Sequence, residues 1–389
     1  MRRGAAVALV VAAALQFVAL RALAQAVPEG EPTSPAKPSL FKDPEDGAFD
    51  VGPWAATRTG ILPIPVPITE PAVGYGLALG LVKIHGGGLA GTKDAPPGVT
   101  GKPVPPDVSA LGGAATENGT WAAVAAHVGY WGGDRWRYVG VAGYMSPRLS
   151  TYDAQGRAYG FNLDGWVVYQ ELKRRVGRTN LFLGARFVWM DTTTTFESGI
   201  APPDAPKPEF ATRDSGLGAV AEFDSRDNTF TPSRGVQLTA SGVFFGSYLG
   251  GDNDYQRYGA NGLFYWDVHP RLVLSTRLRT QAVGGDAPFY ALPFIQLRGI
   301  PAMRYQGETA VSLDGEARWA VTKRWWLVAF AGAGWTDAGS TRGLVDESVH
   351  AGGAGFRYLI ARKLGILTGL DVAKGPEQWA LYVVFGSSW

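Results

Sequence analysis

The sequence predicts an all-β protein, a single transmembrane antiparallel β-barrel of about sixteen strands, with fourteen as the alternative. Three observations lead to this class. Side chains alternate in character every second residue along many segments. The chain ends on an aromatic-rich, alternating segment, residues Trp379–Trp389. The connections between predicted strands alternate between short and long, as expected of barrels with short periplasmic turns and longer extracellular loops.

The N-terminus has the pattern of an export signal. A basic start, an apolar run over Ala5–Leu20 and the small-residue site Ala22-Leu23-Ala24 predict a signal peptide at residues 1–25. A membrane anchor is the alternative, but the run is short for a spanning helix. Residues 26–57 are rich in Pro, Glu, Lys and Ser and are predicted to be a flexible periplasmic leader.

The barrel is predicted to occupy residues 58–389, and the composition fits it. The chain has 53 Gly, 13 Trp, 18 Phe and 15 Tyr among 389 residues. Glycines suit tight turns and crowded positions inside a barrel. The absence of Cys excludes disulfides and thiol chemistry. A formal net charge of +2 argues against a nucleic-acid partner.

Alternation predicts which face of each strand meets lipid. A soluble β-sandwich also alternates, but here charged side chains share the face opposite the aromatic one, as in a membrane barrel. The charged face is predicted to line a wet interior and includes Asp164, Arg186, Arg277 and Arg279. The apolar face is predicted to meet lipid and includes Phe161, Leu163, Val167 and Tyr169.

Counting back from a periplasmic C-terminus assigns each connection to a side. The long segments Asp337–Ser348, Gly284–Glu308 and Gly86–Thr120 then fall outside the cell. About fifteen strands result, and a further short strand is predicted near Phe49–Trp54.

The segment Phe223–Gly235, with the sequence FDSRDNTFTPSRG, is predicted to be a periplasmic turn. Asp and Asn hydrogen-bond local backbone, Pro fixes φ, and Gly allows positive φ before the next strand. The segment resembles the D-[ST]-R-D-N-x-x-x-P-x-x-G turn of the BamA/TamA superfamily, also called bacterial surface antigens. The matching residues are Asp224, Arg226, Asp227, Asn228, Pro232 and Gly235.

A second motif, residues 296–300 with the sequence QLRGI, resembles the R-G-[FY] tip of the family's lid loop. The resemblance implies that this loop folds into the lumen and that Arg298 and Gly299 form its tip. It also implies that Arg298 meets Glu316 on the inner wall, as a charge-assisted contact that pins the loop.

The sequence departs from the family pattern in three places. Ile300 stands where the family has an aromatic, and Gly332 stands where it has a second wall Asp, so one acidic partner is expected for Arg298. The leader is too short to hold a POTRA repeat, the domain that receives clients in the family. The end of the chain, with Phe385, Gly386 and Trp389, resembles the family's closing strand, which implies a signal for the assembly machinery.

The resemblance implies an outer-membrane protein that assists insertion or translocation of protein or lipid. Its expected partners are outer-membrane lipids, the barrel assembly machinery during biogenesis, and a client that the sequence does not name. A passive pore or structural barrel is the alternative. A surface enzyme is a third, weaker hypothesis, because no G-x-S-x-G elbow occurs and the four His lack metal-ligand spacing. We expect no enzyme activity, no cofactor and no metal.

Overall fold

The computed structural model describes residues 40–56, 60–85, 104–197, 208–228, 231–339, 344–362 and 365–386. The predicted signal peptide and Trp389 lie outside the described residues. No helix in the described part of the chain has the length and apolar character needed to span a bilayer.

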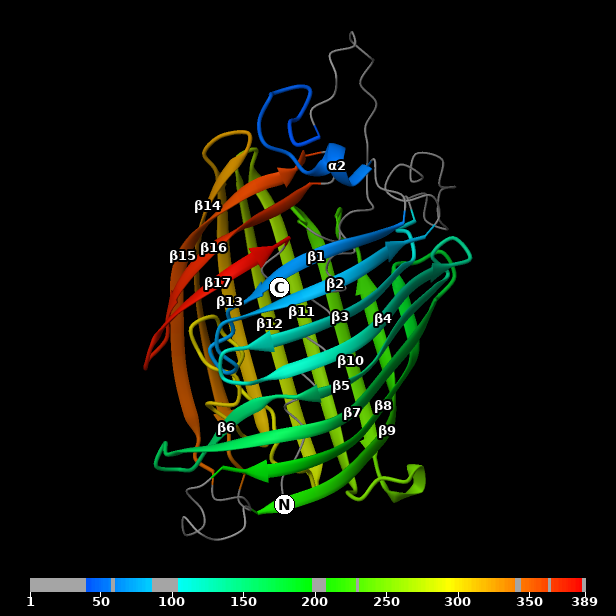
Figure 1. The fold of residues 1–389 in the computed structure, drawn as a ribbon, viewed down its shortest axis with the longest axis vertical. Coiled ribbons are helices and arrows are strands. Elements are labelled where there is room, and N and C mark those ends of the chain that lie inside the picture. Colours follow the sequence, from blue (N-terminus) through cyan, green and yellow to red (C-terminus); the bar gives the residue numbers. More distant parts are fainter. Residues whose placement is uncertain are drawn as a thin grey trace.

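One antiparallel sheet winds through the molecule, and each strand pairs with the next along the chain, except that β5 and β6 both pair with β7 (Figure 1). Its first strands are β1 (Ile61–Ile68), β2 (Gly76–Ile84), β3 (Val108–Thr116), β4 (Trp121–Trp131), β5 (Trp136–Ser146), β6 (Arg148–Tyr152), β7 (Ala158–Arg175) and β8 (Leu181–Phe196). The others are β9 (Glu209–Asp224), β10 (Gly235–Phe245), β11 (Tyr255–His269), β12 (Leu272–Gly285), β13 (Thr309–Ala320), β14 (Trp325–Asp337), β15 (Glu347–Ala361), β16 (Ile366–Lys374) and β17 (Trp379–Phe385).

The strands form a nearly closed barrel of sixteen, as predicted. β5 and β6 pair with successive parts of β7 and count as one strand. Pro147 separates them, since proline has no N–H to give to the ladder. Strand length varies more widely than the sequence suggested: β7 to β9 have 18, 16 and 16 residues, whereas β1, β2 and β16 have 8, 9 and 9.

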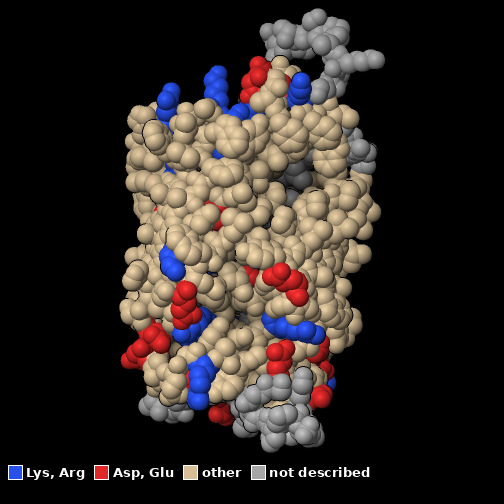
Figure 2. All heavy atoms as spheres, turned by 60° about the vertical axis from the view of Figure 1, so that its left-hand side comes forward, with Lys and Arg blue, Asp and Glu red and all other residues tan. Residues whose placement is uncertain are grey.

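The outer surface has the pattern of a membrane-spanning barrel. Figure 2 shows a broad band with few charged side chains, and Lys, Arg, Asp and Glu gathered above and below it. Large apolar residues such as Leu79, Leu111 and Leu278 are exposed on the outer wall. An antiparallel barrel satisfies the backbone hydrogen bonds between its strands, which the bilayer interior requires.

The predicted long outer loop at Gly86–Thr120 is wrong. Residues 108–116 form β3, which pairs with β2 from Gly76↔Thr116 to Ile84↔Val108. The connection from β2 to β3 therefore lies at the same end as the short turns, and only residues 117–120 turn at the opposite end. Residues 86–103 of that connection are outside the described part of the chain. The small side chains of β3, with the sequence VSALGGAAT, give little alternation in polarity, so the sequence pattern does not reveal this strand.

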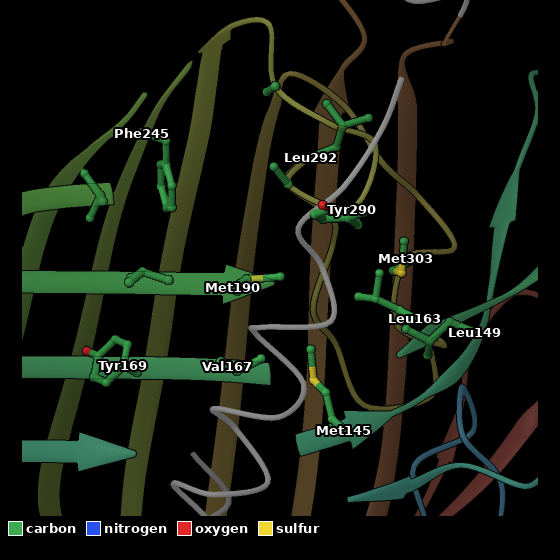
Figure 3. Packing of buried hydrophobic residues seen from close by; sticks show 14 of the residues in the cluster. Met145, Leu149, Leu163, Val167, Tyr169, Met190, Phe245, Tyr290, Leu292 and Met303 are labelled. Atoms are coloured by element: carbon green, nitrogen blue, oxygen red, sulfur yellow. The ribbon is translucent and has the colours of Figure 1, made fainter. Parts of the chain in front are cut away.

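The predicted facing of β7 is also wrong. Its odd-numbered residues are buried inside the barrel, so Phe161, Leu163, Val167 and Tyr169 point inward and Asp164 points outward. The interior is apolar at this height because the β12–β13 connection fills it (Figure 3).

Arg186 and Arg277 face the interior as predicted, where they pair with Glu171 and Asp314.

Part of the predicted flexible leader is anchored to the barrel. Arg324, in the β13–β14 turn, forms ion pairs with Asp43, Asp46 and Asp50 at 2.9, 2.7 and 2.7 Å. Arg362, at the end of β15, forms another with Asp43 at 2.6 Å. We call residues 40–56 the leader clamp. It binds the end of the barrel where the short turns lie (Figure 1).

The short strand predicted at Phe49–Trp54 does not form. Phe49 makes an isolated bridge with Lys42, and residues Gly52–Ala56 form the short helix α2. The Asp50 carboxylate accepts the Gly52 N–H at 2.7 Å, which favours a turn over an extended strand.

Candidate functional site

The β12–β13 connection, residues 286–308, is packed inside the barrel, and we call it the inner segment. Phe289, Tyr290, Ile295 and Met303 are at most 2% exposed. Figure 3 shows Tyr290, Leu292 and Met303 among inward side chains of several strands. The Tyr290 hydroxyl donates to Asp214 of β9 at 2.9 Å. The inner segment stays inside the barrel because its side chains are largely apolar and pack against the apolar inner wall.

Arg298 lies at the centre of an ion cluster on the inner wall. Its Nη1 is 2.8 Å from Glu316 Oε2 of β13 and 2.7 Å from Asp371 Oδ2 of β16. Its guanidinium carbon is 3.5 Å from the centre of the Phe330 ring of β14. Three strands therefore hold one side chain of the inner segment. Charge-assisted contacts in a dry site are strong when their geometry is good.

Arg298 has two acidic partners, so the expectation of one is wrong. Asp371 also accepts two hydrogen bonds from Arg357, at 2.6 and 2.9 Å. The Asp371 carboxylate lies over Gly355. A Cβ added at Gly355 would be 2.0 Å from Asp371 Oδ1, so only glycine leaves room for the carboxylate. At Gly332 the space expected for a second Asp is taken by Leu297, whose Cδ2 is 2.7 Å from where a Cβ would be.

The Arg298 contact is incompletely satisfied. Its Nε and Nη2 are buried and have no hydrogen-bond partner among the described residues. A buried, unsatisfied donor costs about 1–3 kcal/mol. The cluster therefore holds the inner segment with less than the full strength of an Arg–carboxylate fork.

The tip of the inner segment also contacts the closing hairpin, β16–β17. The Gly299 N–H donates to the Tyr382 hydroxyl of β17 at 2.9 Å. Gly299 has φ +95° and faces Gly375 in the hairpin turn, so close that a Cβ on Gly299 would lie 2.8 Å from the Gly375 nitrogen. Arg304 adds a hydrogen bond to Glu377 of the same turn at 2.8 Å.

Ile300, which replaces the family's aromatic, is buried beside these contacts. It belongs to an apolar cluster with Ile295, Leu297, Tyr305, Val349 and Ala351. Its Cγ1 is 3.4 Å from where a Cβ on Gly375 would be, so a branched aliphatic side chain fills the space at the hairpin turn.

The seam between β1 and β17 is weakly joined. With β5 and β6 counted as one strand, a pairing register is described for each pair of consecutive strands, but none is described between β1 and β17. Across the seam, the Val383 N–H donates to the Thr69 side-chain oxygen at 3.2 Å. The inner segment also reaches the β1 side, because Glu70 accepts a backbone hydrogen bond from Ala302, and burial raises the pKa of Glu70 to about 7.

The predicted periplasmic turn is compact. Asp224 pairs with Arg226 at 2.9 Å, and Asp227 accepts the Ser233 N–H at 3.0 Å. Gly235 has φ +103°, and a Cβ there would lie 2.7 Å from the Ser225 carbonyl. The other motif residues join in: Asn228 accepts the Thr231 N–H, and the Pro232 carbonyl accepts a hydrogen bond from Arg318. Residues 229–230 lie outside the described part.

Phe385 and Gly386 lie at the end of β17, the strand on one side of the seam. Phe385 is 40% exposed on the outer wall. Gly386 has φ +76°, and its N–H donates to the Leu367 carbonyl of β16 at 2.7 Å.

Asp371 and Tyr382 are site residues that were not predicted from the sequence. Both stand in short strands next to the seam, and no local motif surrounds them. The available signal was an acid at an inward position of the apolar run ILTGLDVAK, where a buried carboxylate needs a cationic partner.

This architecture defines a class: a sixteen-stranded outer-membrane β-barrel whose lumen is occupied by its own β12–β13 connection. The chain resembles the Omp85 superfamily, whose domain model matches residues 144–296. It has the fold of the BamA/TamA-type barrels, and it is a protein of the bacterial outer membrane.

Solved structures of this fold align with most of the chain. BamA from Haemophilus ducreyi lacking POTRA domains 1–3 has a TM-score of 0.57 at 13% identity, over 85% of this chain and 70% of that one. CdiB from Escherichia coli has a TM-score of 0.56 at 12% identity, over 83% and 61%. CdiB from Acinetobacter baumannii has 0.55 at 10%, over 84% and 59%. The chain thus spans about three fifths of each CdiB chain. No curated protein matches it.

Proposed function

We propose that the protein is a non-catalytic barrel that assists insertion or translocation of a protein or lipid client by opening the seam between β1 and β17. The observation that carries this proposal is how the closing hairpin is held. The described contact across the seam is one hydrogen bond from backbone to side chain, whereas the inner segment binds the hairpin through Arg298, Gly299 and Arg304. The resemblance to assembly-factor barrels supports the same role.

In this proposal the inner segment keeps the seam closed. It contacts both sides, at Tyr382 of β17 and at Glu70 just after β1. Release of the tip would free the hairpin while β2 to β15 stay fully paired. An edge strand freed in this way can pair with an incoming strand through backbone hydrogen bonds. The proposed partners are therefore outer-membrane lipids and an unfolded client, together with the assembly machinery during biogenesis.

The proposal can be tested with a seam disulfide, because the chain has no Cys of its own. Thr69→Cys with Val383→Cys would join the two sides of the seam. The barrel is reconstituted in liposomes, and folding of an added urea-denatured eight-stranded barrel is followed by its gel mobility shift. We expect the wild type to speed client folding, the oxidised variant to lose that effect, and reduction to restore it.

A matched control carries a disulfide within the closing hairpin, Ala373→Cys with Ala380→Cys, at residues that pair directly. It leaves the seam unlinked and should keep the activity. If oxidation of the seam variant changes nothing, the seam is not the route. If the wild type does not speed folding of any client or lipid transfer, the passive barrel is the better description.

A further inference from the structure

A row of polar side chains crosses the lipid-facing wall near the periplasmic end. Ser109 of β3, His127 of β4 and Gln170 of β7 lie on successive strand pairings, with Gly140 of β5 between the last two. They share the outward face with exposed Leu77, Leu79, Leu81 and Leu111. We call His85, Ser109, His127, Tyr138 and Gln170 the outer polar row. Polar groups on a lipid-facing wall are costly, so a row of them needs an explanation.

The row is joined by hydrogen bonds. The Ser109 hydroxyl lies 2.9 Å from His85 Nε2 and 2.9 Å from His127 Nδ1. The Tyr138 hydroxyl donates to the Gln170 side chain. Ser109 can donate to one ring and accept from the other, which leaves His85 Nδ1 and His127 Nε2 with no described partner. At least one of these outward nitrogens then carries a proton and can donate to a ligand.

Two glycines allow aromatic rings to frame the row. A Cβ on Gly129 would lie 2.7 Å from the Trp131 ring, and one on Gly140 would lie 2.3 Å from the Tyr138 hydroxyl. Both rings therefore lie flat against the wall, stacked with centres 5.5 Å apart. His127 lies 5.9 Å from the Tyr138 ring. Trp and Tyr are typical of the membrane–water interface, where lipid head groups lie.

The charges around the row favour an anion. Lys83 is exposed on the same outward face, directly opposite Ser109. Arg174 lies over the Trp136 ring at 5.4 Å, at the periplasmic edge. The nearby acid is Asp107, and its two oxygens already accept the Tyr130 N–H and the Trp131 ring N–H, at 2.7 and 3.1 Å. Its negative charge is therefore partly compensated by donors of the wall.

We propose that the outer polar row binds the phosphate group of a membrane phospholipid. At least one of the two imidazoles would donate to the phosphate oxygens, together with Lys83. The aromatic rings and the leucines below would pack against the glycerol and the acyl chains. A phosphodiester at this position supplies the acceptors that the outward ring nitrogens lack. The site is independent of the seam, so it stands or falls separately from the proposed client activity.

The test uses the purified full barrel in detergent and native mass spectrometry. The probes are dioleoylphosphatidylglycerol, dioleoylglycerol with the same chains but no phosphate, and inorganic phosphate. We expect the wild type to retain the phospholipid about tenfold better than dioleoylglycerol, as charge-assisted hydrogen bonds would give. His85→Gln with His127→Gln should remove that preference. His350→Gln, at an exposed outer position on β15, is the matched control and should keep it.

Several results would overturn the site. Equal retention of the two lipids by the wild type would mean ordinary lipid contact. Unchanged phospholipid retention in the double variant would exclude the imidazoles. Inorganic phosphate bound as well as the phospholipid would make the ligand a free anion. The double variant could lose retention simply because it misfolds. Lys83→Gln changes only an exposed side chain, so it should fold normally and still weaken phospholipid retention several-fold.

Discussion

At the scale of single residues, the molecule depends on groups that serve several partners at once. Asp371 binds two arginines, Arg298 from the inner segment and Arg357 from β15. Glu316 has Arg298 as its close partner, and its contact with Arg318 is long, at 4.0 Å. The two acids of the Arg298 cluster are therefore not equivalent.

We expect Asp371→Asn to loosen the inner segment more than Glu316→Gln does. Loss of one partner of a buried pair costs about 3–5 kcal/mol, and Asp371 would leave two arginines short of an acceptor. Limited proteolysis of residues 284–308 measures the effect. Arg298→Ala removes the arginine that both acids bind and should give the fastest cleavage. Equal protection in all three variants and the wild type would mean that the ion cluster does not hold the segment.

Gly299 gives a second test at this scale. An added Cβ would meet the backbone of Gly375 at 2.8 Å, in addition to the strain of φ +95°. Gly177→Ala is the matched control, since its φ is +57° and nothing lies within 4 Å. We expect Gly299→Ala to lower the free energy of unfolding by about 2–4 kcal/mol and Gly177→Ala by about 1 kcal/mol. Denaturant unfolding followed by tryptophan fluorescence would show whether the two differ.

At the scale of elements, the leader clamp is an ionic contact on the ends of β13 to β16. A hydrogen bond from Arg324 lowers the pKa of Asp46 to about 2. A carboxyl with a lowered pKa stabilises the docked state above its ordinary pKa, near 3.8, and that stabilisation is lost as the pH falls towards 2. The clamp also lies near the seam, since Val51 and Trp54 pack against an apolar cluster that includes Leu62 of β1.

We expect the clamp to open in acid and in Arg324→Gln. Hydrogen exchange at the Val51 N–H, which donates to the Ile360 carbonyl at 2.8 Å, reports its docking. Exchange, corrected for intrinsic rates, should rise as the pH falls from 4 to 2 and should already be fast in the variant at pH 7. Arg157→Gln, which breaks an exposed pair with Asp153 at the other end of the barrel, should leave it unchanged. Slow exchange in Arg324→Gln would contradict an ionic clamp.

At the scale of the whole molecule, the inner segment decides whether the barrel conducts ions. With the lumen filled by residues 286–308, we expect low conductance of the wild type in planar bilayers and larger, unsteady openings in Arg298→Ala. Arg213→Ala, which removes an exposed charge at the outer end of β9, should behave like the wild type. A large, steady wild-type conductance would favour the passive pore.

The number of strands, sixteen, was predicted with a strand at Phe49–Trp54 that does not form and without β3. The sequence was sufficient for the barrel class and the partner Glu316, because period-two alternation and a motif carry that information locally. It was not sufficient for Asp371 or for the facing of β7. Asp371 meets Arg298 only through the pairing of strands far from each other along the chain. Phe161 and Leu163 point inward because the inner segment supplies an apolar surface inside the barrel, which alternation along one strand does not reveal.

The strands near the seam are much shorter than those on the far side of the barrel. At about 3.3 Å per residue and a tilt of about 45°, a nine-residue strand covers about 20 Å of height and an eighteen-residue strand about 40 Å. Hydrocarbon is about 30 Å thick, so a bilayer that matches β1, β2 and β16 would be thinner there, at a cost of a fraction of a kcal/mol per Å. A thinned bilayer is a lower barrier to anything that crosses it. The membrane would then be thinnest at the place where the wall of the barrel is most weakly joined.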